Sequence, residues 1–589
     1  LVAASPTAYF TTYTHQHLLI MMHQFKYQIK RHVISNIRSS NSSSTILRTC
    51  PISGRKAIGN FDDGKAHKES DDSSSSAVAA KNPTYFKVPS LPYLGSVGAT
   101  TYAGMPPLNF SKSFEFFPEM RRRFGDFYSF GFPGLGSKND SHGTLYVTCD
   151  PNEMLKVVRN QGPLPQGLIT QQWGILKWNK ENNFSIVAEE DGLFGQGVHW
   201  KRLRNFFQTD LLSPAAAKGY IPGMIEAAQL ASRGAPASAD NMNYFLNCCA
   251  FDLFNTVMFG ELTEVADTVS PTDPDNLEFV DSALSGLSNG TQLLTSPYQV
   301  IMGRELGVET KQYKTMAKNF GVAWEIGKKK IDVFMQKFAE GSLNDNQKAS
   351  YLARAINRQQ QDEIVSEREM QELCFAGLFA AVDTTSSVLS WNLLHIAMNP
   401  DIQEKVYEEL SSLALPSAGG NKKLNPEMFE KSQMPYFNAV LRETQRMTPS
   451  SIFALKKTLL DDMEICGMNI PKGSVLMLDS HSVGMDPDKV HDPDTYNPNR
   501  WLPDAVERRK GSSTAVLDHP YARDQFGQGA RRCPGSRVAM TEVSVMLSQL
   551  ILDWKITTVP AIDSWKDVNY EQQTMLVPEF PTLRFEPRA

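Results

Sequence analysis

The sequence predicts a mostly α-helical fold with a minor β part, in one large domain. Three segments, at about 366–398, 435–447 and 534–554, have the pattern of long helices. Strand-like segments are short and few, and no second change of composition divides residues 83–589. A single domain of about 500 residues is unusually large, so we expect its helices to surround one deep cavity.

The overall composition is that of a globular protein. The chain has 589 residues, of which 41% are hydrophobic and 21% charged, with a formal net charge of −5. These proportions allow a large buried core. The negative net charge does not favour a general attraction to nucleic acid, so we expect no nucleic-acid partner.

Residues 1–61 differ from the rest in charge. They contain no Asp or Glu but seven basic residues, and they are rich in Ser and Thr. This composition is typical of an organelle transit peptide, and an ordinary basic disordered tail is the alternative. The longest apolar run near the start, Leu18–Met22, has five residues, whereas roughly 20 span a bilayer. We therefore expect no transmembrane anchor there, while peripheral membrane association stays open.

Residues 62–82 are polar and of low complexity, which predicts a disordered linker. We expect the folded domain at 83–589. Its clearest strand-like segments are Leu145–Thr148 and Val475–Leu478.

The strongest helical segment is 366–398. Ser366 and Glu369 have the spacing of a capping box, and Pro400 ends the run. A helix of this length measures about 48 Å. Its middle, from Phe375 to Val388, is apolar or small nearly all round, which predicts a buried helix.

Seven cysteines are scattered along the chain without a CxxC spacing, which argues against a disulfide framework, a zinc site or covalent haem attachment. Cys533 stands apart, in the run FGQGARRCPG at 526–535. Glycines allow a tight loop before it, a long helix follows, and Arg531 and Arg532 flank it. A helix N-terminus and nearby cations favour a thiolate, which is the strong electron-donating ligand that iron uses to cleave O–O bonds. A buried structural cysteine in a glycine-rich turn is the alternative.

This run contains every fixed position of F-x-x-G-x-R-x-C-x-G and resembles the haem-binding signature of the cytochrome P450 family. The resemblance covers about residues 83–589. It implies the P450 fold around a buried haem b (iron protoporphyrin IX), Cys533 as the axial ligand of the iron, and Phe526 as a cofactor-binding residue of the same loop.

Other P450 landmarks occur in the expected order. Trp200 and Arg204 match the family's W-x-x-x-R, which binds a haem propionate, although an exposed amphipathic helix would show the same pattern. Arg531 matches another propionate-binding position. Lys457 stands where the family usually has a third arginine, and lysine keeps the charge without the bidentate fork.

Glu443 and Arg446 form the family's E-x-x-R, on one helical face. The segment 496–501 resembles the family's F-x-P-x-R-W, whose arginine, here Arg500, completes a buried ion network with that pair. Because buried charges need partners, we expect this network to be structural.

The long helix contains the run AAVDTT at 380–385, which resembles the family's oxygen-activation motif. Reductive cleavage of O₂ consumes two protons, and an acid beside an alcohol, in a locally loosened helix that admits water, can relay them. The resemblance assigns this relay to Asp383 and Thr384. Ala381 replaces the usual glycine, which predicts a tighter oxygen groove. The alternative is that Thr384 only bonds back to its own helix.

Within the family the resemblance is to the mitochondrial type, on the run HPYA at 519–522, Arg442 and Arg537; Gln525 departs from it. This implies a location on the matrix side of the mitochondrial inner membrane, with a plastid as the alternative, and a ferredoxin-type electron donor. A basic cluster around the Cys loop could bind an acidic ferredoxin: Arg523, Arg531, Arg532 and Arg537.

The implied reaction is insertion of one oxygen atom of O₂ into an apolar organic substrate, sterol- or lipid-like by analogy. One alternative is a haem-thiolate isomerase or dehydratase of lipid hydroperoxides, and a second is a non-catalytic haem-binding protein. The complete Asp383-Thr384 motif and Cys loop disfavour both. We expect the substrate pocket walls at about 165–195, 280–305, the middle of the long helix, Ser450–Leu455 and Gln572–Leu576.

Overall fold

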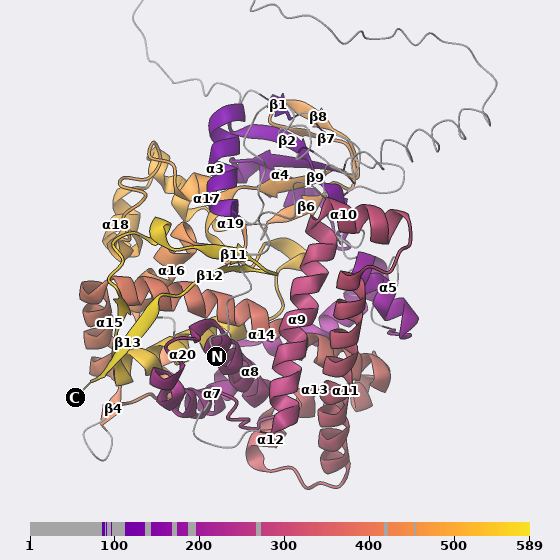
Figure 1. Ribbon diagram of the computed structural model, residues 1–589, viewed down its shortest axis with the longest axis vertical. Coiled ribbons are helices and arrows are strands. Elements are labelled where there is room, and N and C mark those ends of the chain that lie inside the picture. The colour runs from indigo at the N-terminus through magenta and orange to yellow at the C-terminus, as the bar shows by residue number, and fades with distance from the viewer. Residues whose placement is uncertain are drawn as a thin grey trace, which may run out of the picture. The chain divides into compact units, whose positions relative to one another are not determined.

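The computed structural model describes one compact unit (Figure 1), which begins at residue 80. The described residues are 85–88, 90, 96, 112–135, 143–167, 173–185, 196–266, 273–416, 422–430, 432–452 and 455–588. The segments predicted as transit peptide (1–61) and linker (62–82) lie outside these residues, so both stay predictions.

Helices dominate the unit, as the sequence predicted. In chain order they are α3 Ser113–Phe124, α4 Pro151–Asn160, α5 Trp173–Glu181, α6 Gly197–Leu212, α7 Pro214–Gly234, α8 Met242–Met258, α9 Pro274–Thr295, α10 Pro297–Gln299, α11 Lys311–Ala339, α12 Asp345–Ala349, α13 Tyr351–Asp362, α14 Glu367–Met398, α15 Pro400–Leu413, α16 Pro435–Met447, α17 Ser480–Gly484, α18 Pro503–Arg508, α19 Pro520–Arg523 and α20 Ser536–Asp553.

Helix α14 is the central element. Its predicted capping box is formed: the Glu369 N–H donates to Ser366 Oγ at 3.2 Å, and the Ser366 N–H donates to Glu369 Oε2 at 2.8 Å. The helix packs against α8, α9, α11 and α20, so it is buried on nearly all sides. Among the described residues it is the only helix long and apolar enough to cross a membrane, and most of its apolar stretch is buried in the protein. That burial is what a core helix shows.

The other predicted helices are confirmed at or near their expected bounds. Helix α16 runs from Pro435 to Met447, as expected. Helix α20 begins at Ser536, two residues later than expected, because residues 533–535 still belong to the preceding loop. Helices α9 and α11 lie side by side along one flank of α14 (Figure 1).

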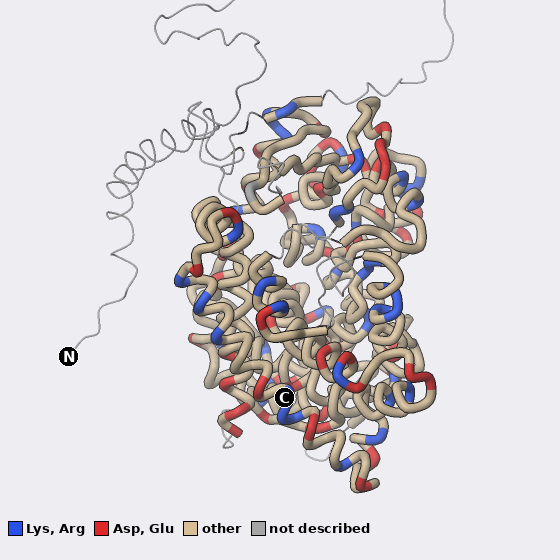
Figure 2. The backbone as a smooth tube through the Cα atoms, turned by 90° about the vertical axis from the view of Figure 1, so that its right-hand side faces the viewer, with Lys and Arg blue, Asp and Glu red and all other residues tan. Residues whose placement is uncertain are grey.

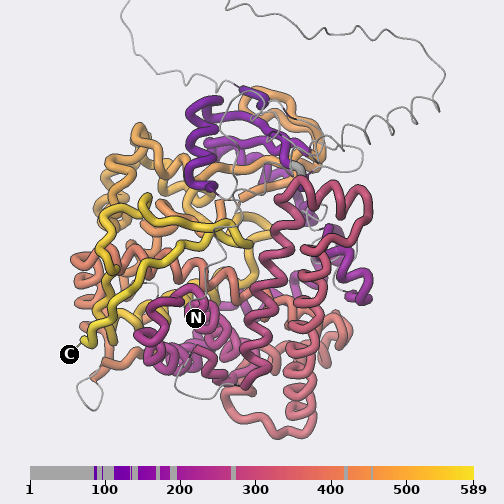
Figure 3. Tube along the Cα trace, viewed as in Figure 1, coloured from indigo at the N-terminus to yellow at the C-terminus, as the bar shows by residue number. Residues whose placement is uncertain are grey.

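The largest sheet lies at one end of the unit and joins distant parts of the chain. Figure 3 shows its strands from the first and the last thirds of the chain side by side. Strands β3 and β9, both predicted from sequence, pair in parallel with Leu145 opposite Val475. The sheet has the order β1-β2-β3-β9-β6, with bounds β1 Tyr85–Lys87, β2 Phe127–Gly131, β3 Thr144–Thr148, β9 Val475–Leu478 and β6 Lys456–Thr458.

The remaining strands form two-stranded antiparallel pairs. They are β4 Leu415–Pro416 with β5 Lys422–Lys423, β7 Met463–Ile465 with β8 Met468–Ile470, β10 Trp554–Val559 with β13 Thr582–Pro587, and β11 Tyr570–Gln572 with β12 Leu576–Pro578. The β11–β12 hairpin packs on α14, which brings residues near the C-terminus to the middle of the fold.

Charged residues of both signs are interspersed along the chain. Figure 2 shows Lys and Arg mixed with Asp and Glu over the side that faces the viewer. An anionic partner would therefore have to bind a local basic cluster.

Candidate active site

The Cys loop joins α19 to α20. The Cys533 N–H donates to the Phe526 carbonyl at 3.0 Å, which closes the loop on itself. Gly529 has φ +78°, and a Cβ there would lie 2.8 Å from Val158 Cγ1. Only glycine fits that position without strain, so the turn that presents Cys533 depends on it.

Cys533 is half-buried in the protein. Burial raises the pKa of its thiol, while the Gly535 N–H and the charges of Arg204 and Arg532 lower it. The net direction for the thiol by itself is upward, and the thiolate ligand of iron stays a prediction. The expectation counted the helix and the cations but could not count desolvation, which here is the largest effect.

The residues predicted to bind propionates meet at this loop: two distant segments, α6 and β6, contribute to them, and Arg531 belongs to the loop itself. Arg204 of α6 donates to the Arg532 carbonyl and to Gln208 Oε1. Lys457 of β6 donates to the Gln528 carbonyl at 2.8 Å. The Arg531 guanidinium lies 4.1 Å from the centre of the Trp200 ring and donates to the Pro165 carbonyl at 2.8 Å.

The charges of Arg204, Lys457 and Arg531 repel one another at a site that is partly shielded from water. Burial, with Arg531 and Arg204 nearby, lowers the pKa of Lys457 to about 8. Burial and Arg204 lower the pKa of Arg531 to about 10. Within the described part of the chain, Arg204 and Lys457 form no ion pair with a carboxylate.

An anionic ligand would relieve this repulsion. The two propionates of haem b are anions of the required kind, and Cys533 offers a sulfur for its iron. The residues present therefore fit the cofactor that the resemblance predicts.

The middle of α14 faces an apolar cavity of about 280 Å³. Aromatic rings dominate its walls; Phe320 and Phe379, for example, pack edge-to-face with centroids 4.7 Å apart. The lining residues are Ile175, Trp178, Asn179, Phe184, Leu287, Gly290, Thr291, Leu294, Phe320, Glu372, Phe375, Ala376, Phe379, Ala380, Thr384 and Thr574. Four of the predicted wall segments thus contribute residues to this cavity: 165–195, 280–305, the middle of α14 and 572–576. Among the described residues of Ser450–Leu455, none lines this cavity; Ile452 and Leu455 are buried in hydrophobic clusters of the core. Phe320 of α11 was not predicted.

Asp383 and Thr384 differ in exposure. Thr384 lines the cavity, and its hydroxyl donates to the Ala380 carbonyl at 3.0 Å. Asp383 is only 3% exposed, and burial raises the pKa of its carboxyl to about 6. Such an acid can take up and release a proton near neutral pH.

The predicted local loosening of α14 is wrong. The helix is continuous from Glu367 to Met398. Ala381 explains this, because alanine favours the helix by about 1 kcal/mol over the glycine that is usual there. The Thr384 back-bond, which the sequence left open as an alternative, is also formed.

One buried acid was missed. Glu542 of α20 is 1% exposed, and burial raises the pKa of its carboxyl to about 8. Thr385, beside Thr384, donates to Glu542 Oε2 at 3.3 Å. An acid among the apolar residues of a helix is the sequence signal that could have identified Glu542.

The E-x-x-R network forms as expected. Glu443 accepts bonds from Arg446 at 2.7 Å, from Arg500 at 2.9 Å and from the Trp501 indole at 2.8 Å. Although burial raises the pKa of Glu443, the two arginines outweigh it and lower the pKa. The network holds α16 against the 498–501 segment and is structural.

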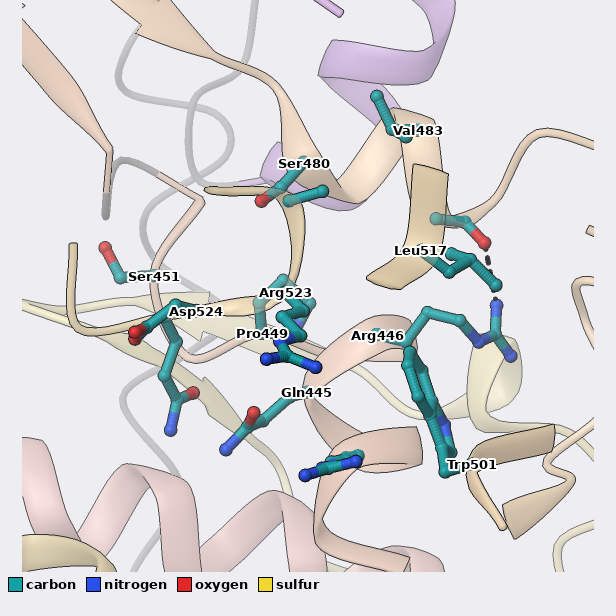
Figure 4. Close-up of a pocket in the computed structure, with 14 residues that line it drawn as sticks. Gln445, Arg446, Pro449, Ser451, Ser480, Val483, Trp501, Leu517, Arg523 and Asp524 are labelled. Carbon is teal, nitrogen blue, oxygen red and sulfur yellow. Dashed lines mark hydrogen bonds between the residues drawn. The ribbon is translucent and has the colours of Figure 1, made fainter. Parts of the chain in front are cut away.

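A second, narrow cavity of about 30 Å³ separates this network from the Cys loop. Figure 4 shows Arg446 and Trp501 on one side of it and Arg523 and Asp524 on the other. Arg442 and Arg523 line it and are exposed. Burial of part of its side chain and the charge of Arg523 lower the pKa of Arg442.

A family model described as "Cytochrome P450" matches residues 178–582. The mitochondrial sterol 26-hydroxylase of Rattus norvegicus is 26% identical over 450 residues, covering 73% of this chain and 77% of that protein. The mitochondrial cholesterol side-chain cleavage enzyme of Mesocricetus auratus is 23% identical over 463 residues, covering 76% and 80%. The human sterol 26-hydroxylase is 26% identical over 426 residues, covering 70% and 75%.

Proposed function

The chain belongs to the cytochrome P450 family, and from this premise we propose a haem-thiolate monooxygenase that oxidises an apolar, sterol-like substrate with electrons from a ferredoxin-type protein. The reaction is R–H + O₂ + 2 e⁻ + 2 H⁺ → R–OH + H₂O. The observation that carries the proposal is that Arg204 and Lys457 bond to the loop that contains Arg531 and Cys533.

The cofactor is proposed to be haem b. Cys533 would ligate its iron, while Arg204, Lys457 and Arg531 would pair with the propionates and Trp200 and Phe526 would border the ring. When bound, haem supplies the redox chemistry that activates O₂. The protein's own contribution is to hold the sulfur, exclude water and deliver protons.

The cavity along α14 supports an apolar substrate. Rings and aliphatic chains make up most of its wall, and such walls bind by burying apolar surface. Two relatives are named as sterol or cholesterol enzymes, and by that likeness we propose a sterol or a similar bulky lipid.

Asp383 and Thr384 are proposed as the proton relay. Thr384 lies at the cavity surface, and Asp383 behind it has a pKa near neutral. The hydroxyl of Thr384 would give up its back-bond to Ala380 and pass a proton toward the oxygen, and Asp383 would reload it.

The proposed ferredoxin site leaves out two of the arginines that the sequence indicated. Arg531 turns inward to Trp200, and Arg532 pairs with Asp524. Arg442, Arg523 and Arg537 are exposed and could attract acidic side chains.

The proposed location is the matrix side of the mitochondrial inner membrane, with residues 1–61 as transit peptide and a plastid as the alternative. The relatives named above are mitochondrial. Import of a fluorescent protein fused after residues 1–61 would test this, and cytosolic retention would contradict it.

The test of function starts from haem-loaded protein reduced in the presence of carbon monoxide. We expect the spectrum of thiolate-ligated haem, and we expect Cys533→Ser to lose it. Cys466→Ser is the matched control, because Cys466 is also half-buried but lies in the β7–β8 turn. A thiolate spectrum that persists in Cys533→Ser would refute the ligand.

A screen of sterols for a spin-state shift would then identify the substrate. We expect product formation to require a ferredoxin and its reductase and to consume one O₂ per product. Turnover of lipid hydroperoxide without reductant would instead support the isomerase or dehydratase alternative, and haem binding without any turnover would support a non-catalytic protein.

A further inference from the structure

One part of the apolar cavity wall along α14 is polar. Asn179 of α5 and Glu372 of α14 both line the cavity. The loop after α5 connects these two residues, because the Phe184 N–H donates to the Asn179 carbonyl at 2.9 Å. The next residue, Ser185, donates to Glu372 Oε2 from its N–H at 2.7 Å and from its hydroxyl at 2.8 Å. Asn179 and Glu372 therefore belong to the same part of the wall.

The Asn179 side chain is held in one orientation. Its Nδ2 donates to the Ile175 carbonyl at 2.7 Å. A carbonyl can only accept, so this bond fixes which atom of the amide is the nitrogen and which is the oxygen. Asn179 is only 4% exposed, and its Oδ1 forms no hydrogen bond with any described residue. A buried acceptor without a partner costs about 1–3 kcal/mol, and a donor that enters the cavity removes this cost.

Helix α5 itself is fixed against its neighbours. The Trp173 indole donates to the Leu293 carbonyl of α9 at 3.1 Å. Trp178 packs edge-to-face on Phe320 of α11, with ring centroids 5.4 Å apart. These contacts keep the Asn179 amide at one place in the wall, so little entropy is lost when a ligand binds to it.

Glu372 limits which chemical group suits this part of the wall. Its carboxylate already accepts bonds from Arg368 at 2.9 Å and from Ser185. A negative charge here disfavours an anionic ligand group. Because Arg368 balances that charge, an ammonium group would be buried without a counter-ion of its own. A neutral hydroxyl on an apolar body fits best, since it can donate to Asn179 Oδ1 while the rings of the wall cover the rest.

The cavity extends from this polar part to Thr384, which also lines it. Glu372 and Thr384 are twelve positions apart on the continuous helix α14, which corresponds to about 18 Å along the helix axis. A substrate that spans this distance is elongated. Its polar group and its reacting carbon then lie at opposite ends of the molecule.

We propose that Asn179 determines specificity by binding the hydroxyl group of an elongated lipid alcohol. The substrate O–H donates to Asn179 Oδ1, the apolar body lies along Phe375 and Phe379, and the carbon to be oxidised lies at Thr384. Asn179 contacts the end of the substrate that does not react, so it selects and positions the substrate and takes no part in the chemistry. This inference rests on the proposed function and names the substrate class of the same site.

A purely structural role for Asn179 makes a different prediction. Asn182 offers the comparison, because its Nδ2 donates to the Trp178 carbonyl at 2.8 Å in the same type of bond. Asn182 is exposed and is not among the described residues that line the cavity. If only this bond matters, Asn179→Leu and Asn182→Leu should both lower the thermal midpoint and leave the preference among ligands unchanged. If Asn179 binds a hydroxyl, Asn179→Leu alone changes the preference.

The experiment measures dissociation constants by equilibrium dialysis of tritium-labelled lipids against the haem-loaded protein. The probes are cholesterol and octadecanol, each paired with the deoxy analogue in which hydrogen replaces the hydroxyl. For the alcohol that binds more tightly, we expect the parent to prefer it over its analogue by on the order of tenfold. Asn179→Leu should lose this preference, and Asn182→Leu should keep it. A parent that distinguishes neither alcohol from its analogue, or an Asn179→Leu variant that keeps the preference, would overturn the proposal.

A second measurement needs only the parent protein. Mass spectrometry of the products formed with ferredoxin, its reductase and O₂ locates the oxidised carbon. We expect the alcohol to be oxidised at the end opposite to its hydroxyl and the deoxy analogue at a wider range of positions, whereas oxidation beside the hydroxyl would contradict the proposal. If the parent oxidises no apolar compound, the proposed function fails. If it binds alcohol and analogue equally and oxidises both at the same positions, only this inference fails.

Discussion

Glu542 predicts an unusual pH dependence of stability. Its carboxyl is 1% exposed, and its pKa of about 8 lies above the ordinary 4.5. Between these values the folded protein keeps a proton that the unfolded chain releases, so stability falls as pH rises through this window. At about pH 7 the deficit is about 3–4 kcal/mol, from about 2.5 pH units at about 1.4 kcal/mol each.

Glu542→Gln should remove this deficit, because glutamine is neutral in both states and has nearly the same shape. For a folded unit of about 500 residues the entropy of unfolding is about 1 kcal/mol per degree, so the thermal midpoint should rise by about 3 °C at about pH 7. At about pH 5 the rise should be under about 1 °C, because this pH lies only about half a unit above the ordinary pKa of the unfolded chain, so little of the deficit has built up.

The assay is thermal unfolding of haem-loaded parent and variant at both pH values and one scan rate. Glu408→Gln, on the exposed face of α15, is the control and should shift neither midpoint. If Glu542→Gln is no more stable than the parent at about pH 7, Glu542 is ionised in the folded protein and the reasoning is refuted.

Three further outcomes follow from the described contacts. Glu443→Gln leaves the buried Arg446 and the half-buried Arg500 short of a charge and should lower the free energy of unfolding by about 3–5 kcal/mol in urea titrations. Glu430→Gln, in an exposed pair with Lys218, should lower it by under about 1 kcal/mol, and equal losses would contradict the network. Lys457→Met should speed haem transfer to a scavenging apoprotein and Lys457→Arg should not, and equal rates would show that no propionate binds there. Gly260→Ala should lower the thermal midpoint, because its φ is +66° and a Cβ would clash with the Asn346 carbonyl; an unchanged midpoint would mean that the backbone shifts freely.

Local patterns were sufficient wherever one segment decides its own structure. The 435–447 helix and the capping box of Ser366 and Glu369 depend on periodicity and on neighbouring side chains, and they were predicted at the right residues. The glycines and cysteine of the 526–535 loop carry their own backbone requirements. Their pattern therefore identifies the loop from the order of its residues alone.

The pKa shifts and the contacts that depend on distant segments were decided by the tertiary structure. Sequence shows Arg531 and Arg532 beside Cys533, but it does not show the desolvation that outweighs the charges of Arg204 and Arg532. It also does not show that Arg531 lies over the Trp200 ring and that Arg532 pairs with Asp524. Nothing local to α14 indicates that the Leu576 carbonyl, almost two hundred residues later, accepts bonds from Ser387 and Trp391. Periodicity and turn chemistry act between near neighbours and are written in the sequence, whereas burial and contact depend on what folds against a residue.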